Sequence, residues 1–224
     1  NGSPLCLGVG DGEFIIASDV LAFSKHLPQV VHLEDREFVI IRDGQYHTEH
    51  LLRGEISKEL EKVDAHHFMI SKGKYPHFML KEIFEQPLSI SRAMSGRLLP
   101  EDGNCKLGGI QMSPREFLDI SDVCFIGCGT SYHAGRVGVY LMESLARISA
   151  TAEVAPELKY RNPIVRHKTL YVGISQSGET ADTITAIKEI LNKGGNVIGI
   201  CNVVGSSMAR LLGKGIYVHA GPEI

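Results

Sequence analysis

From residue 113 onward the sequence alternates short apolar runs with segments of helical periodicity, and this alternation restricts the fold more than any other feature. Each run is apolar throughout, which is typical of strands that are buried on both faces of a parallel sheet. Strands that alternate with helices predict a doubly wound α/β sheet with right-handed crossovers and helices on both faces. The predicted strands are 123–126, 170–174, 196–200 and 216–219, with 151–155 as a weaker fifth.

Local signals mark the helices between these strands. Ser113 before Pro114 predicts a helix start, because serine caps the first turn and proline fits its first position. The pair Lys193-Gly194 predicts a helix end. Two helices have apolar residues at helical spacing that we expect to pack on the sheet, namely Val137, Leu141, Leu145 and Ile148 in one and Ile184, Ile187 and Leu191 in the other.

The first 50 residues predict a β-meander. The dipeptide Asp43-Gly44 predicts a tight type I′ hairpin, because both central residues of that turn need a positive φ. Four such strands are too few for a two-sided core, so we expect this segment to be the remainder of a longer domain. The predicted strands are 4–9, 13–17, 29–33 and 38–41.

A mixed region separates this meander from the α/β part. Segment 77–87 predicts a short amphipathic helix that is interrupted at Pro87, because proline has no amide N–H to donate. Segment 98–107 is rich in turn residues and predicts a loop. The predicted organisation is a β-rich domain part at 1–50, a connector at 51–109 and an α/β domain at 110–224 that is incomplete at its C-terminal end.

Polar, glycine-containing turns follow three predicted strands, at residues 127–131, 175–180 and 201–207. Ligands of a doubly wound sheet bind beyond the carboxyl ends of its strands. Free amides at helix starts attract anions, hydroxyls add donors, and glycine lets the main chain approach a ligand. Few cations lie nearby, which favours a small phosphomonoester over a polyanion. The candidate sugar-phosphate ligands are Thr130, Ser131, Ser175, Gln176, Ser177 and Thr180.

The hydroxyl groups of these turns could also serve as simple helix caps. A single serine or threonine at a helix start is as readily a cap as a ligand, but six donor residues in two turns exceed the one cap that each helix needs. A dinucleotide site is disfavoured because its third glycine would fall on Tyr132, and no Gly-Lys-Ser/Thr of a P-loop follows a strand. We expect His133 to pack rather than to bind, and Glu179 to be a charge in a first helical turn rather than a general base.

Composition excludes several classes of protein. The formal net charge of -3 lacks the basic footprint of a nucleic-acid binder. No apolar run approaches the roughly 20 residues that span a bilayer, and no signal-peptide pattern is present. Five scattered cysteines predict unpaired, mostly buried thiols in a reducing cytoplasm. The histidines and cysteines lack zinc-site spacing, so we predict no metal and no cofactor.

Two of the turns carry a family resemblance. Segments 128–135 (CGTSYHAG) and 175–183 (SQSGETADT) resemble the sugar-isomerase (SIS) domain of isomerising glutamine–fructose-6-phosphate aminotransferases, also called glucosamine-6-phosphate synthases. The supporting segments occur in the family's order, so the resemblance covers nearly the whole chain, and they are 2–5, 17–19, 33–35, 77–87 (HFMLKEIFEQP), 202–207 and 220–224.

The resemblance implies a function for the intact protein. Such enzymes make glucosamine 6-phosphate from fructose 6-phosphate and glutamine, the entry to UDP-N-acetylglucosamine synthesis. It implies that 1–50 is the C-terminal part of a glutaminase domain and that 110–224 is the first SIS subdomain. It also implies that Ser175, Gln176, Ser177 and Thr180 surround the phosphate, with Thr130 and Ser131 near the phosphate and the sugar.

Residues 1–224 lack counterparts of the family's catalytic groups. The resemblance implies that the family's catalytic residues lie outside this sequence. These are the nucleophilic cysteine that hydrolyses glutamine and the Glu, His and Lys of the isomerase. We therefore expect no catalytic residue here and no turnover by this chain alone, and a homodimer or larger oligomer for the intact protein. The alternatives are a sugar-phosphate-binding SIS module of a regulator and a stand-alone phosphosugar isomerase or deaminase. The meander and the connector argue against both.

Overall fold

The computed structural model describes residues 5–18, 20–23, 26–62 and 71–221. The chain divides into two compact units, one made of residues 1–84 with 221–224 and the other of residues 85–220. Helix α1 (Phe78–Met94) continues from the first unit into the second.

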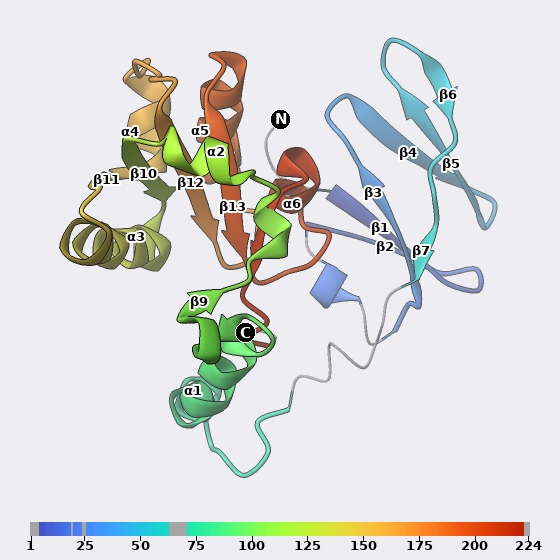
Figure 1. Ribbon diagram of the computed structural model, residues 1–224. Coiled ribbons are helices and arrows are strands. Elements are labelled where there is room, and N and C mark those ends of the chain that lie inside the picture. The colour runs from blue at the N-terminus through green and yellow to red at the C-terminus, as the bar shows by residue number, and fades with distance from the viewer. Residues whose placement is uncertain (1–4, 19, 24–25, 63–70, 222–224) are drawn as a thin grey trace. The chain divides into compact units, whose positions relative to one another are not determined.

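The first unit contains two antiparallel sheets (Figure 1). One has the strand order β2-β1-β3-β7 and the other β4-β5-β6. Phe23 is buried in one cluster of apolar residues, and Leu7 and Val31 form another, against which Val39 and Tyr46 pack. The strands are β1 (Leu5–Val9), β2 (Phe14–Ala17), β3 (Gln29–Leu33), β4 (Glu37–Arg42), β5 (Gln45–His50), β6 (Gly54–Ile56) and β7 (Glu61–Lys62).

The four strands predicted in this region are confirmed within about two residues. The hairpin is confirmed too, since Asp43 and Gly44 have φ values of 53° and 74° between β4 and β5. The expectation of too few strands was wrong. Strands β5, β6 and β7 are short or polar, so their sequences lack the apolar alternation that predicts a strand, yet they extend both sheets.

Two predictions for the connector were wrong. Helix α1 is not interrupted at Pro87 but continues to Met94 and is followed by Gly96 with φ 69°. Its Pro87 lies on an exposed stretch of helix, where water can reach the carbonyl group that proline leaves without a donor. The expected loop at 98–107 contains a short hairpin of β8 (Leu98–Leu99) and β9 (Asn104–Cys105).

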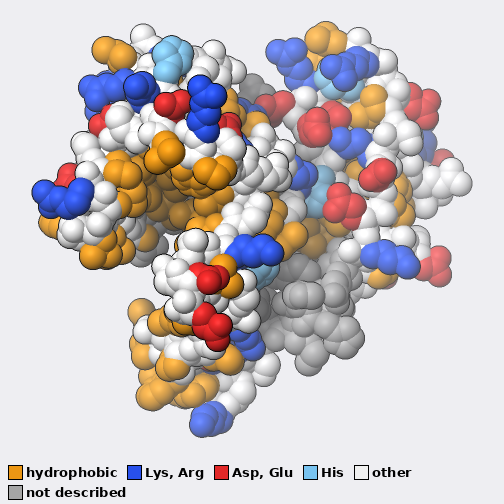
Figure 2. All heavy atoms as spheres, in the orientation of Figure 1, with side chains coloured by type: hydrophobic (Ala, Val, Ile, Leu, Met, Phe, Trp, Pro, Cys, Tyr) orange, Lys and Arg blue, Asp and Glu red, His pale blue; other side chains and the backbone are white. Residues whose placement is uncertain are grey.

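No residue of α1 is buried. Hydrophobic side chains therefore gather on its surface in Figure 2, and the exposed ones are Met79, Ile83, Phe84, Leu88, Ile90 and Met94.

The second unit is built on a five-stranded sheet in which every strand pair is parallel, as predicted. Its order is β11-β10-β12-β13-β14. The chain adds β11 on one side of β10 and then adds β12, β13 and β14 on the other side. The direction of winding therefore reverses between β10 and β12. The strands are β10 (Asp122–Gly127), β11 (Ser149–Val154), β12 (Thr169–Ser175), β13 (Asn196–Cys201) and β14 (Gly215–Tyr217).

Both faces of this sheet are covered, which agrees with the continuous apolar runs. Side chains such as Ile126 and Val197 pack with α4, α5 and α6 on one face. Val172 and Ile198 belong to the cluster on the other face, against which Val139 of α3 packs. The helices are α2 (Pro114–Leu118), α3 (Gly129–Leu141), α4 (Ala155–Tyr160), α5 (Ala181–Asn192) and α6 (Ser207–Leu212).

Helix α5 packs as its sequence predicts, with Ile184 and Ile187 buried. Its end at Lys193-Gly194 is confirmed, since Gly194 has φ 78°. The start of α2 at Ser113 is confirmed as a capping box with Glu116.

The packing face predicted for α3 and the turn after it was wrong for three of its four residues, while the fourth, Ile148, packs against the apolar cluster on the sheet as predicted. Val137, Leu141 and Leu145 are 58%, 52% and 78% exposed. The helix instead approaches the sheet through Gly135 and Gly138, where a Cβ atom would lie only 2.9 Å and 2.8 Å from atoms of Phe125. Small residues that admit a neighbouring ring give no apolar signal, so the pattern of large residues pointed to the wrong face.

Candidate functional site

The two turns with the most candidate residues follow neighbouring strands. Strands β10 and β12 pair in parallel, with Ile126 opposite Gly173, so their carboxyl ends lie at the same edge of the sheet. The turn at 127–131 follows β10 and the turn at 175–180 follows β12. Because the winding direction reverses between these strands, the turns flank the position where ligands of such sheets bind.

The first turn passes from β10 to α3 without a side-chain cap. Cys128 occupies the N-cap position in an extended conformation and makes no capping hydrogen bond. Gly127 is tightly enclosed, since a Cβ atom there would lie 3.2 Å from the carbonyl oxygen of Ile174. Thr130 is exposed and Ser131 is half-buried, so both side chains stand at the open start of α3.

The second turn is held together by its own hydroxyl groups. Ser175 is 2% exposed, and its Oγ accepts a hydrogen bond from the amide of Gly178 at 3.0 Å. The same Oγ lies 2.9 Å from Oγ1 of Thr180, and Oγ of Ser177 accepts from the amide of Glu179 at 3.1 Å. Ser175 therefore shapes the turn from within, while Gln176, Ser177 and Thr180 are half-buried at its surface.

Capping does not account for the hydroxyls at these two turns. Thr180 is the N-cap residue of α5, yet its side chain makes no capping bond. By contrast, Ser113 and Ser206 accept hydrogen bonds from the amides of Glu116 and Ala209, and so they cap α2 and α6. The first amides of α3 and α5 thus lack side-chain caps at one edge of the sheet, which is the arrangement that suits an anion.

The third turn, after β13, supports the second one. The amide of Asn202 donates to the carbonyl of Gln176 at 2.9 Å, and the amide of Met208 donates to the carbonyl of Gly178 at 2.9 Å. The prediction for Glu179 was wrong in detail. This residue precedes α5, and its Oε1 accepts from the amide of Ser207 at the start of α6 at 2.8 Å. A bond between two turns 28 residues apart leaves no local sequence signal.

His133 lies in α3 beside the first turn, as predicted, but it is exposed rather than packed in the core. Its ring contacts that of Tyr132 at a centroid distance of 5.4 Å.

All five cysteines are free. Three are buried, Cys128 is half-buried at the first turn, and Cys105 is exposed, which agrees with the predicted unpaired and mostly buried thiols. Burial raises the pKa of the Cys124 and Cys201 thiols, and the charge of nearby Glu179 adds to the rise for Cys201. Burial thus keeps these two thiols protonated and unreactive near neutral pH.

Within the described parts of the chain, no group of three or more His, Cys, Asp or Glu side chains could hold a metal ion. No helix among those same residues is both long and apolar enough to cross a bilayer.

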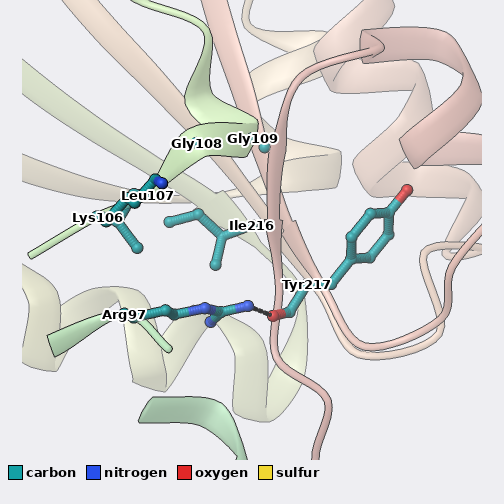
Figure 3. A pocket seen from close by; sticks show the side chains of 8 residues that line it. Arg97, Lys106, Leu107, Gly108, Gly109, Ile216 and Tyr217 are labelled. Carbon is teal, nitrogen blue, oxygen red and sulfur yellow. Dashed lines mark hydrogen bonds between the residues drawn. The ribbon is translucent and has the colours of Figure 1, made fainter. Parts of the chain in front are cut away.

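A separate cavity of about 110 Å³ lies beside the edge strand β14. Figure 3 shows Arg97 extended under Ile216, and its guanidinium donates to the carbonyl oxygen of Tyr217. Gly109 abuts the carbonyl of Gly215 on the same strand. These contacts cover outward carbonyl groups of an edge strand, which protects it from pairing with another chain. None of the six predicted site residues lines this cavity.

A family model for the SIS domain matches residues 116–224, the part of the chain that contains both turns. Residues 116–224 are a SIS domain. The match includes all six candidate residues, whose individual roles remain a prediction.

The whole chain is similar to curated aminotransferases. It is 44% identical over 223 residues to the isomerising glutamine–fructose-6-phosphate aminotransferase of Chlorobaculum tepidum, covering 100% of this chain and 36% of that protein. The corresponding protein of Bacteroides thetaiotaomicron is 41% identical over 99% of this chain and 36% of its own length. The chain is therefore homologous to a segment of these enzymes and spans about a third of their length.

A solved structure agrees with this result. The C-terminal domain of glucosamine-fructose-6-phosphate aminotransferase from Francisella tularensis has 38% sequence identity and a TM-score of 0.61. The alignment covers 69% of this chain and 43% of that chain.

Proposed function

We propose that the SIS domain of this chain binds the phosphate group of a hexose 6-phosphate, fructose 6-phosphate or glucosamine 6-phosphate, between the two turns. The observation that carries the proposal is the pair of neighbouring helix starts, at α3 and α5, whose first turns have no side-chain cap. Main-chain amides and neutral hydroxyls would then meet the phosphate oxygens, since both the free amides and the helix dipoles favour an anion there.

The phosphate ligands that we propose come from both turns. Thr130 and Ser131 would contact the phosphate and the sugar from the start of α3. Gln176, Ser177 and Thr180 would surround the phosphate from the second turn. Ser175 also belongs to this set in our sequence-based prediction, although its buried hydroxyl is already engaged within the turn.

We further propose that the chain is part of an isomerising glutamine–fructose-6-phosphate aminotransferase of the cytoplasm. Its similarity to these enzymes extends through residues 1–109, which supports this assignment over an SIS module of a regulator. In this proposal residues 1–50 belong to a glutaminase domain, 51–109 form a connector, and the intact protein is a homodimer or larger oligomer. The 224-residue chain alone would turn over neither glutamine nor fructose 6-phosphate.

The test is isothermal titration of the 224-residue chain with fructose 6-phosphate, inorganic phosphate and fructose. We expect fructose 6-phosphate to bind, phosphate to bind more weakly, and fructose to give no heat of binding. Thr130→Ala and Ser177→Ala should each weaken the binding of fructose 6-phosphate by about ten- to a hundredfold, because a hydrogen bond to a charged group contributes roughly 1.5–3 kcal/mol.

Ser144→Ala is the matched control. Ser144 is an exposed hydroxyl residue beyond the far end of α3, and its Oγ donates to the carbonyl of Tyr140. This variant should bind fructose 6-phosphate with unchanged affinity. Equal affinity of the wild type and of the double variant Thr130→Ala/Ser177→Ala would reject the assignment, and a loss in only one of the single variants would reject a site shared by both turns.

A further inference from the structure

The second turn is tied to the third turn by contacts that come from outside the proposed site. Besides the hydrogen bonds to Gln176 and Gly178, the Oε1 atom of Glu179 accepts from the amide of Ser207. Among these ties, the Glu179 bond is the one that a side chain makes, and therefore the one that a substitution can remove.

Glu179 makes this tie in a setting that is unfavourable for a carboxylate. Its Oε2 atom is buried and has no hydrogen-bond partner among the described residues. Burial of a charged oxygen without a partner opposes folding, so stability alone gives a weak reason for glutamate at this position. What the side chain supplies is the connection between the second turn and the start of α6.

The direction of the carboxylate also matters for a bound anion. Glu179 lies one residue from Thr180 and two from Ser177, both proposed phosphate ligands. A carboxylate free to turn toward them would repel a phosphate group. The bond to Ser207 holds the negative charge against the amide at the start of α6, where the helix dipole favours it.

We propose that Glu179 is a positioning residue of the sugar-phosphate site, which acts through Ser207 to hold the turn at 176–180 in its binding conformation. This inference rests on the proposed function. Glu179 itself does not contact the sugar phosphate. Its bond fixes the main chain from which Ser177 and Thr180 reach the ligand, and preorganisation of this kind strengthens binding without a new ligand contact.

The experiment compares Glu179→Ala and Glu179→Gln in the 224-residue chain by isothermal titration with fructose 6-phosphate. Alanine should weaken binding about tenfold, because the tie is lost. Glutamine should stay within about threefold of the wild type, because its amide oxygen can still accept from Ser207. Glutamine as weak as alanine would overturn the proposal, since the charge and not the bond would then matter, and so would alanine as tight as the wild type.

Glu116→Ala is the matched control for a loss of stability. Glu116 Oε2 accepts from the amide of Ser113 at 2.7 Å at the start of α2, so its removal also deletes a carboxylate bond at a helix start. Glu116→Ala should bind fructose 6-phosphate like the wild type. A loss of affinity as large as that of Glu179→Ala would show a general effect of stability and overturn the proposal.

Amide hydrogen exchange of the unliganded chain separates this inference from the proposed function. Glu179→Ala should speed exchange in peptides that cover 176–180 and 203–208, whereas Glu116→Ala should not. Unchanged exchange in Glu179→Ala would overturn the tie even if fructose 6-phosphate binds. Faster exchange in a chain whose wild type binds no fructose 6-phosphate would uphold the tie and reject the function.

Discussion

Replacement of Gly178 by alanine tests the packing between the second and third turns. Gly178 has φ 68°, a left-handed conformation that costs a residue with a Cβ atom about 1–2 kcal/mol. The new Cβ would also lie 2.5 Å from Cβ of Ser206 and collide with its Oγ. Overpacking of a buried site costs about 1–3 kcal/mol, so we expect Gly178→Ala to destabilise the chain by about 2–5 kcal/mol.

The assay is equilibrium unfolding in urea, with Ser206→Gly and the double variant as partners. Glycine at an N-cap costs only a few tenths of a kcal/mol, so Ser206→Gly alone should be mild. In the double variant the collision disappears and the backbone strain remains, which leaves a loss of about 1–2 kcal/mol. Additive losses of the two single variants, or a loss below about 1 kcal/mol for Gly178→Ala, would refute this account of the contact.

Three further predictions are tested by the same urea assay. Ser175→Ala should cost about 1–3 kcal/mol, because an amide inside the turn loses its acceptor, and a loss below about 0.5 kcal/mol would contradict that role. Burial is the largest single influence on the pKa of Glu37 and raises it, but the hydrogen bonds from Lys58 and the amide of Glu34, together with the charges of Lys58 and His50, hold the pKa below its ordinary value. The stability that this pair supplies is present above the ordinary pKa of a glutamate and is lost as the pH falls through the lowered pKa of Glu37. The destabilisation caused by Lys58→Met should therefore become smaller in acid. A destabilisation that does not change with pH would refute this prediction. Leu145→Gln, at an exposed position, should change the free energy of unfolding by less than about 0.5 kcal/mol. Ile190→Ala, at a fully buried position, should lower it by about 2–5 kcal/mol. A loss for Leu145→Gln as large as that for Ile190→Ala would show that Leu145 packs on the sheet, as the sequence suggested.

The sheet of the SIS domain was predictable because its signals are short-range. Runs such as 170–174 and 196–200 are apolar throughout, and the residues at their ends change abruptly to glycine, serine and threonine. The location of the candidate site was predicted from these strands, since parallel strands place their carboxyl ends at one edge of a sheet. The hairpin at Asp43-Gly44 was predictable for the same reason, because a type I′ turn depends on two adjacent residues.

The errors arose where a tertiary contact decides the outcome. Helix α3 packs through Gly135 and Gly138 because Phe125 occupies the space that larger side chains would need. Helix α1 continues past Pro87 because that stretch of helix is exposed to water. The bond from Glu179 to α6 joins turns that are distant in sequence, so neither turn alone predicts it.

The distribution of helix caps supports a ligand at the two turns more strongly than the count of hydroxyls does. A side-chain cap contributes about 1 kcal/mol to a helix, and this chain has such caps at Ser113 and Ser206. Helix α4 starts at Val154, which has no group that could cap it. Thr180 could cap α5 and does not, because its hydroxyl pairs with Ser175. Because Thr180 could cap the helix but is directed away from it, main-chain amide donors remain open at the sheet edge. An anion that accepts hydrogen bonds from these amides would supply the stabilisation that a cap otherwise gives. Fructose 6-phosphate should therefore stabilise the starts of α3 and α5 more than any other part of the SIS domain.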